Sequence, residues 1–178
     1  MYQYLFFDLD GTLTNPTLAE ARIAVEKSRE RVRNVGIIEN EVLEGIPQML
    51  ENLKRRGACL AVASSKPEEY VRQILDKFEL SPYFTQVVGA TMDEKRTAKA
   101  EVIQEAFARL SIGEEEKRRV LMIGDRRHDV EGARACGIDS LGVYIGFAGP
   151  GELEAAGATY IARSVKEMAE FLEACLAA

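Results

Sequence analysis

The chain has 178 residues, of which 47% are hydrophobic and 29% are charged, and its formal net charge is −6. This length corresponds to one domain with enough apolar residues for a full core. The composition argues against intrinsic disorder and against a general attraction to nucleic acids or anionic membranes, so small molecules or proteins are the expected partners.

Short β-rich apolar runs alternate with longer stretches of helical period, which is typical of a parallel sheet covered by helices on both faces. Strands are predicted at Tyr4–Leu9, Cys59–Ala63, Gln86–Gly89, Val120–Ile123 and Ser140–Tyr144, with a short sixth strand at Thr159–Ala162. Helices are predicted at Val42–Arg56, Glu68–Phe78, Lys99–Leu110, Val130–Cys136 and Val165–Leu176. The expected fold class is α/β: a Rossmann-like three-layer α/β/α core with a mainly parallel sheet.

A helical stretch from Pro16 to Val35 stands apart, because it lies between the first strand and the helix that leads to the second strand. Its apolar positions follow a three-four spacing and charged residues fill the rest. Two placements are open for this helix: on the surface of its own core, or paired with a second subunit in a homodimer. Since no linker is visible, residues 1–178 are interpreted as a single domain with an insertion at residues 15–40.

Polar residues collect where three of the predicted strands end and where one helix begins. In open α/β sheets, reactive groups gather at the carboxyl ends of the strands. The segments concerned are Asp8-Leu9-Asp10-Gly11-Thr12 after the first strand, Ser64-Ser65-Lys66 after the second, Gly124-Asp125 with Asp129 after the fourth, and Lys99 at the start of a helix. Each alone has an ordinary structural explanation: an Asp-x-Asp turn, for example, or a capping box made by Ser65 with Glu68.

Convergence of these groups at one edge would place four carboxylates and one lysine together, with a net charge of −3. Two like charges about 4 Å apart repel by roughly 4 kcal/mol at an effective dielectric near 20, so the arrangement requires a counter-ion. A divalent cation held by Asp8 and Asp125 would remove much of this repulsion. Because the available ligands are all oxygen atoms, they favour Mg²⁺ over zinc.

The same segments resemble the four motifs of the haloacid dehalogenase-like hydrolases, and within that family the phosphoglycolate-phosphatase-like branch. The first motif is similar to Asp8-Leu9-Asp10-Gly11-Thr12-Leu13, and the others fall on Ser64, on Lys99, and on Gly124-Asp125 with Asp129. The resemblance covers nearly the whole chain except the insertion. It implies a Mg²⁺-dependent phosphatase that acts on a small-molecule phosphate ester.

Residue by residue, the resemblance implies that Asp8 is a nucleophile that forms an aspartyl-phosphate, while Asp10 acts first as general acid and then as base. Ser64 and Lys99 would bind phosphoryl oxygens, and Asp129 would hold the metal shell or orient Lys99. The implied metal set is Asp8, Asp10 through its backbone carbonyl, Asp125 and Asp129, and the implied substrate-binding residues are Gly11, Thr12, Ser65 and Lys66.

The chain departs from these relatives in the insertion after the first motif, which in them forms a cap of several helices over the substrate. Here 56 positions separate Asp8 from Ser64, which leaves room for about one long helix, so the cap is expected to be a remnant and the site open. Three alternatives stay open: a phosphomutase of the same family, a phospho-receiver-like module, and a regulatory binding module without activity.

The number and spacing of the cysteines indicate the cellular compartment in which the protein is expected. Cys59, Cys136 and Cys175 are odd in number and contain no close pair, which suits neither a disulfide framework nor a zinc site, so a cytoplasmic location is expected. The apolar run that begins at Leu5 has no basic leader, and no segment approaches the roughly 20 apolar residues of a membrane span. Neither a signal peptide nor a membrane anchor is therefore expected.

Overall fold

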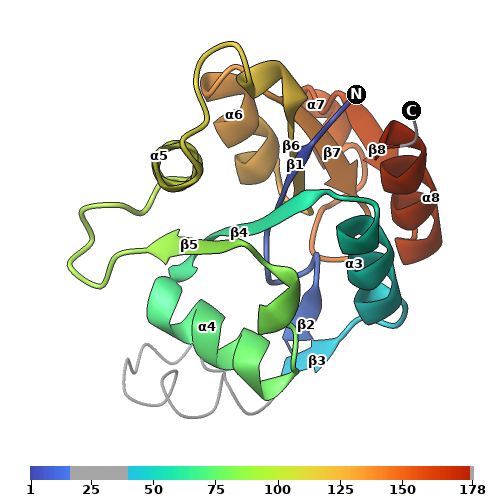
Figure 1. The fold of residues 1–178 in the computed structure, drawn as a ribbon. Coiled ribbons are helices and arrows are strands. Elements are labelled where there is room, and N and C mark those ends of the chain that lie inside the picture. Colours follow the sequence, from blue (N-terminus) through green and yellow to red (C-terminus); the bar gives the residue numbers. More distant parts are fainter. Residues whose placement is uncertain (17–39, 177–178) are drawn as a thin grey trace.

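The computed structural model of the chain describes residues 1–16 and 40–176 (Figure 1). The helix predicted from Pro16 to Val35, and with it the expected remnant of the cap, falls on residues 17–39 and lies outside the described residues. None of the described helices is long and apolar enough to cross a membrane.

Six strands form one parallel sheet in the order β5-β4-β1-β6-β7-β8. They are β1 (Tyr4–Phe7), β4 (Cys59–Pro67), β5 (Gln86–Ala90), β6 (Val120–Gly124), β7 (Asp139–Val143) and β8 (Tyr160–Ala162). The central strand β1 pairs with β4 on one side and β6 on the other, so the predicted segments after these three strands meet at one edge. All six predicted strands are present, and the predicted fold class is confirmed.

Helices cover both faces of the sheet (Figure 1). The first face carries α3 (Ile46–Arg55), α4 (Glu68–Lys77) and α8 (Val165–Leu176), and the second carries α5 (Lys99–Leu110) and α6 (Arg127–Ala135). Along β1, Leu5 and Phe7 pack toward the first face and Phe6 toward the second. Burial on both faces explains why the strands read as continuous apolar runs rather than as alternating patterns.

Several short elements were not predicted. The strands β2 (Thr14–Pro16) and β3 (Asn40–Val42) form a small antiparallel pair, and the others are α7 (Glu152–Ala156) and the 3₁₀ turns Ser81–Tyr83 and Lys117–Arg119. Because β3 ends at Val42, α3 begins at Ile46 rather than at Val42, with Pro47 in its first turn where no N–H is needed. Pairing of Pro16 with Asn40 brings the two ends of the 17–39 segment together, as an insertion requires, although the domain division itself stays a prediction.

The predicted capping box of Ser65 and Glu68 is wrong. Strand β4 continues through Ser65 to Pro67, and α4 begins at Glu68 with Pro67 as its N-cap and no side-chain cap. Pro67 has extended backbone angles and ends the strand directly at the helix, so Ser65 lies too early to cap it. The Glu68 carboxylate instead accepts hydrogen bonds from arginine side chains and from the Gly89 N–H.

Candidate active site

Asp8 and Lys99 are in direct contact at the centre of the carboxyl edge of the sheet. Asp8 is the first residue after β1, and Lys99, the first residue of α5, has only 4% of its side chain exposed. The Lys99 Nζ atom lies 2.9 Å from Asp8 Oδ1 and 2.7 Å from Asp129 Oδ1, and it donates to the Ala63 carbonyl at 2.9 Å. Burial alone would lower the pKa of Lys99, but the Asp129 and Asp8 carboxylates outweigh it and raise that pKa, so the ammonium stays charged.

Asp125 is a fully buried carboxyl group with one unsatisfied oxygen. It follows β6, and its Oδ2 accepts the Phe147 N–H at 2.6 Å. Its Oδ1 is buried without a hydrogen-bond partner among the described residues. Burial, with a contribution from Asp8 and Asp129, raises the pKa of Asp125 to about 7. An unpartnered buried carboxylate oxygen of this kind is suited to a cation ligand.

Three carboxyl groups converge as a metal site requires. One oxygen each of Asp8, Asp125 and Asp129 lies within 4.8 Å of the other two. Asp129, in the first turn of α6, is already engaged, because one oxygen faces Lys99 and the other accepts the Arg126 N–H at 3.0 Å. Burial raises the pKa of Asp129 to about 6, although Lys99 acts in the opposite direction. The all-oxygen donor set and the orphaned Asp125 oxygen fit Mg²⁺.

Asp10 belongs to the same edge, but its carboxylate faces a different partner. Lys66 Nζ lies 2.9 Å from Asp10 Oδ2 and 3.2 Å from Oδ1, and within the described part of the chain the acidic cluster of three does not include Asp10. Burial raises the pKa of Asp10, while the Lys66 charge lowers it, and the net direction is upward. Ser64 is buried beside this pair, and its Oγ accepts the Lys66 N–H at 3.3 Å.

The remaining predicted residues lie around this centre, and their roles stay predictions. Gly11 has φ +80, and a Cβ on it would lie 2.2 Å from Asp125 Oδ2, so only glycine fits the turn. Its N–H is paired with the Thr14 carbonyl at 2.6 Å. Thr12 is fully buried, whereas Ser65 is exposed at the end of β4.

The loop after β7 also belongs to the site, and sequence reasoning missed it. A Cβ on Gly146 would lie 2.3 Å from Asp125 Oδ2 and 2.4 Å from the Gly11 carbonyl oxygen, so this loop packs directly on the metal-ligand candidate. The neighbouring Phe147 supplies the N–H that holds Asp125. The loop offers few polar side chains, but two glycines after a strand at the same edge, Gly146 and Gly149, were a usable signal.

Gly146→Ala is expected to weaken Mg²⁺ binding about tenfold or more and to destabilise the fold by roughly 1–3 kcal/mol, because the added methyl group must displace Asp125 or Gly11. The measurement is the Mg²⁺ concentration at half of the metal-induced rise in the thermal unfolding temperature. Gly149→Ala is the matched control, since its Cβ would meet nothing closer than 3.8 Å. Equal Mg²⁺ midpoints in the two variants would contradict the close packing at Gly146.

Comparisons with known proteins identify the family. A sequence model described as haloacid dehalogenase-like hydrolase matches residues 19–143. A 5'-nucleotidase from Pseudomonas aeruginosa is 32% identical over 215 aligned positions, which cover 97% of this chain and 96% of the relative. A phosphoglycolate phosphatase from Aquifex aeolicus is 35% identical over 114 positions, covering 64% of this chain and 52% of the relative. The crystal structure of a predicted phosphatase from Clostridium acetobutylicum superposes with a TM-score of 0.85 at 32% identity, covering 97% of this chain and 98% of that one.

The chain belongs to the haloacid dehalogenase-like hydrolases. The prediction of an enzyme of the phosphatase class is confirmed, as is the resemblance to the phosphoglycolate-phosphatase-like branch. The alignment with the nucleotidase is longer than the 178 residues of this chain, so that relative carries segments without a counterpart here. This difference agrees with a shortened insertion.

Proposed function

We propose that this phosphatase hydrolyses small phosphate monoesters with Mg²⁺ through an aspartyl-phosphate on Asp8. The observation that supports this most strongly is the convergence of Asp8, Asp125 and Asp129 within 4.8 Å, with Lys99 paired to the first and last of them. A structural cluster would need no unpartnered buried oxygen, whereas Asp125 has one among the described residues.

In the first step, an Asp8 carboxylate oxygen attacks phosphorus, a bond forms between them, and the bond from phosphorus to the ester oxygen breaks. Asp10 donates its proton to the departing oxygen, which leaves as an alcohol. Asp8 faces the Lys99 ammonium at 2.9 Å, whereas burial raises the pKa of Asp10 and favours its protonated form. The two environments therefore suit the two roles.

In the second step, the Asp10 carboxylate takes a proton from water, and the resulting hydroxide oxygen attacks the aspartyl-phosphate. The bond between Asp8 and phosphorus breaks, releasing inorganic phosphate and the free Asp8 carboxylate. Lys99 and Ser64 would stabilise the phosphoryl oxygens, because both lie buried where the strands end. Asp129 would orient Lys99, since their contact of 2.7 Å is the shortest around that ammonium.

Asp8, Asp125 and the backbone carbonyl of Asp10 would hold Mg²⁺, with Asp129 close to its shell. When bound, Mg²⁺ neutralises the carboxylate cluster and stabilises charge on the phosphoryl group. The substrate class is small phosphorylated metabolites, which is supported by the nucleotidase and the phosphoglycolate phosphatase among the relatives. Choice among such substrates depends on residues beyond this centre.

The test is hydrolysis of an aryl phosphate with and without metal, followed by a panel of phosphorylated metabolites. Activity in Mg²⁺ is expected to fall to background after EDTA and to return when Mg²⁺ is added in excess of the chelator. Release of inorganic phosphate identifies a hydrolase, whereas transfer of the phosphoryl group to a second position of a sugar phosphate would identify a mutase. Full activity in EDTA would overturn the proposed metal dependence.

A further inference from the structure

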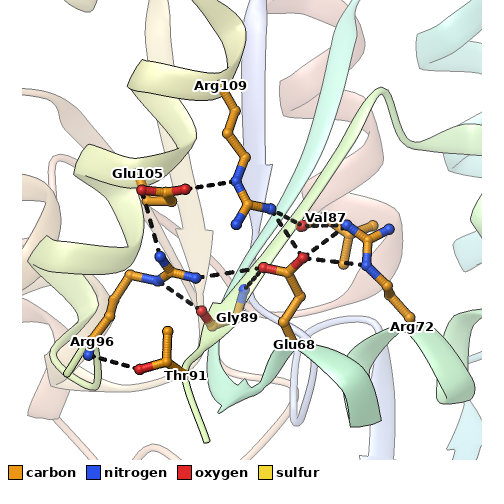
Figure 2. A network of polar contacts seen from close by, with 8 residues as sticks. All are labelled: Glu68, Arg72, Val87, Gly89, Thr91, Arg96, Glu105 and Arg109. Carbon is orange, nitrogen blue, oxygen red and sulfur yellow. Dashed lines mark hydrogen bonds and ion pairs between the residues drawn. The ribbon is translucent and has the colours of Figure 1, made fainter. Parts of the chain in front are cut away.

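A cluster of charged side chains lies where β4, α4, β5 and α5 meet (Figure 2). Its centre is the Glu68 carboxylate, which lies 2.9 Å from Arg72, 3.0 Å from Arg109 and 3.6 Å from Arg96. Glu105 adds a second carboxylate, 2.8 Å from Arg109 and 3.5 Å from Arg96. We call these five residues the Glu68 cluster.

The Glu68 cluster closes the free edge of the sheet. Strand β5 is an outer strand of the described sheet, so within residues 1–16 and 40–176 the backbone groups on its open side have no neighbouring strand to pair with. Side chains take that place: the Val87 carbonyl accepts from Arg72 at 3.0 Å and from Arg109 at 3.2 Å, and the Gly89 carbonyl accepts from Arg96 at 3.0 Å. The Gly89 N–H donates to Glu68 at 3.3 Å (Figure 2).

The cluster also connects two segments that carry site residues. Glu68 comes four positions after Ser64, at the junction of β4 and α4, and Arg96 comes three positions before Lys99. The turn between Thr91 and Arg96 is held by two hydrogen bonds, from the Thr91 N–H to the Arg96 carbonyl at 2.9 Å and from the Arg96 N–H to Thr91 Oγ1 at 3.0 Å. A shift of the Arg96 side chain would therefore also move the backbone of this turn, which leads directly into α5.

These contacts differ from isolated surface ion pairs, which typically contribute about 0–1 kcal/mol. The Glu68 and Arg96 side chains are only 21% and 18% exposed, and both also bond backbone groups of Gly89. Burial alone would raise the pKa of Glu68, but its hydrogen bonds with Arg109 and Arg72 outweigh it and lower that pKa. Loss of the Arg96 side chain would remove one cation from beside the Glu68 carboxylate and would take away the donor that Arg96 offers to the Gly89 carbonyl.

We propose that Arg96 and Glu68 are positioning residues for phosphoryl transfer: they hold the segments that carry Lys99 and Ser64 at a fixed separation. This role rests on the proposed function of Lys99 and Ser64. Neither residue touches the reacting atoms in this arrangement, and each acts through the backbone that it bonds. If these side chains only covered the free edge of the sheet, their loss would lower the stability of the fold without a specific effect on Lys99.

Arg72 provides a matched control for Arg96, because each donates to Glu68 and to one β5 carbonyl. Arg72, however, lies in the same helix as Glu68, and its contacts described here are with Glu68 and the Val87 carbonyl rather than with the turn that precedes Lys99. Arg96→Gln is expected to lower kcat for an aryl phosphate roughly tenfold or more with a smaller change in KM, since small misplacement of a charge-stabilising group lowers the rate steeply. Arg72→Gln is expected to stay within about twofold of the parent chain.

A second measurement follows Lys99 itself and needs no activity. The protein is treated briefly with acetic anhydride in Mg²⁺ buffer, and acetylation of each lysine is measured by mass spectrometry. Lys99 is 4% exposed and Lys166 is 83% exposed, so Lys166 serves as the internal reference. Acetylation of Lys99 relative to Lys166 is expected to rise in Arg96→Gln, to stay at the parent level in Arg72→Gln, and to be partly restored in Arg96→Lys.

The outcomes separate this proposal from the proposed function. Similar kcat values and similar Lys99 acetylation in Arg96→Gln and Arg72→Gln would overturn the positioning role, even if the parent chain is an active phosphatase. If the parent chain hydrolyses no phosphate ester, the proposed function fails, and the acetylation contrast still tests whether Arg96 positions Lys99. Thermal unfolding of both variants shows whether their losses of stability match.

Discussion

Asp8→Asn is expected to reduce hydrolysis of an aryl phosphate by roughly a thousandfold or more, because an amide cannot form the aspartyl-phosphate. Among the described residues, Asp8 is the only carboxyl group that both contacts Lys99 and follows the central strand β1, so none of its neighbours there replaces it. The substitution keeps the size of the side chain. Initial rates in saturating Mg²⁺ measure the effect, and mass spectrometry of the quenched enzyme should show a phosphoryl adduct only in the parent chain.

Asp76→Asn is the control for this loss, since Asp76 lies exposed near the end of α4, away from the acidic cluster. It should leave the rate within about twofold of the parent value. Substantial activity of Asp8→Asn, or a phosphoryl adduct that persists in it, would refute the assignment of Asp8 as nucleophile. Circular dichroism of both variants distinguishes loss of chemistry from loss of fold.

Without metal, the free energy of unfolding is expected to fall as the pH rises from about 4 to about 7. Burial raises the pKa of Asp125 to about 7 and that of Asp129 to about 6, while ordinary aspartates in the unfolded chain titrate near 3.9. In this window the folded state binds more protons than the unfolded state, so stability decreases with pH. At about 1.4 kcal/mol per pKa unit, Asp125 alone corresponds to about 4 kcal/mol.

Urea unfolding in EDTA at pH 5.5 and pH 8 measures this decrease, and excess Mg²⁺ at pH 8 should restore the lost stability. Asp125→Asn should flatten much of the pH dependence, because the amide does not ionise. Glu152 acts with the opposite sign, since backbone N–H groups of Arg127 and Gly149 lower its pKa to about 2, but that contribution is lost only below about pH 4.5. Equal or greater stability at pH 8 in EDTA would contradict the expectation.

The sequence alone was sufficient for the six-stranded sheet and for the meeting of three acidic residues at its carboxyl edge. Strands buried on both faces read as apolar runs, and the helices Lys99–Leu110 and Val165–Leu176 have the predicted bounds because their apolar periodicity is a local property. Motif residues after β1, β4 and β6 had to meet, since parallel neighbours share a carboxyl edge. Convergence of Asp8, Asp125 and Asp129 therefore follows from their positions in the chain.

Only the tertiary structure decided which partner each polar group takes. Asp10 faces Lys66, which is 56 positions away, and Asp125 is held by the N–H of Phe147 from a loop that carries little polar signal. Glu68 bonds arginines of α4, α5 and the preceding turn rather than capping its own helix. Local periodicity reports which face of an element is buried, but the choice among competing donors depends on distances between elements that are set only when the chain packs.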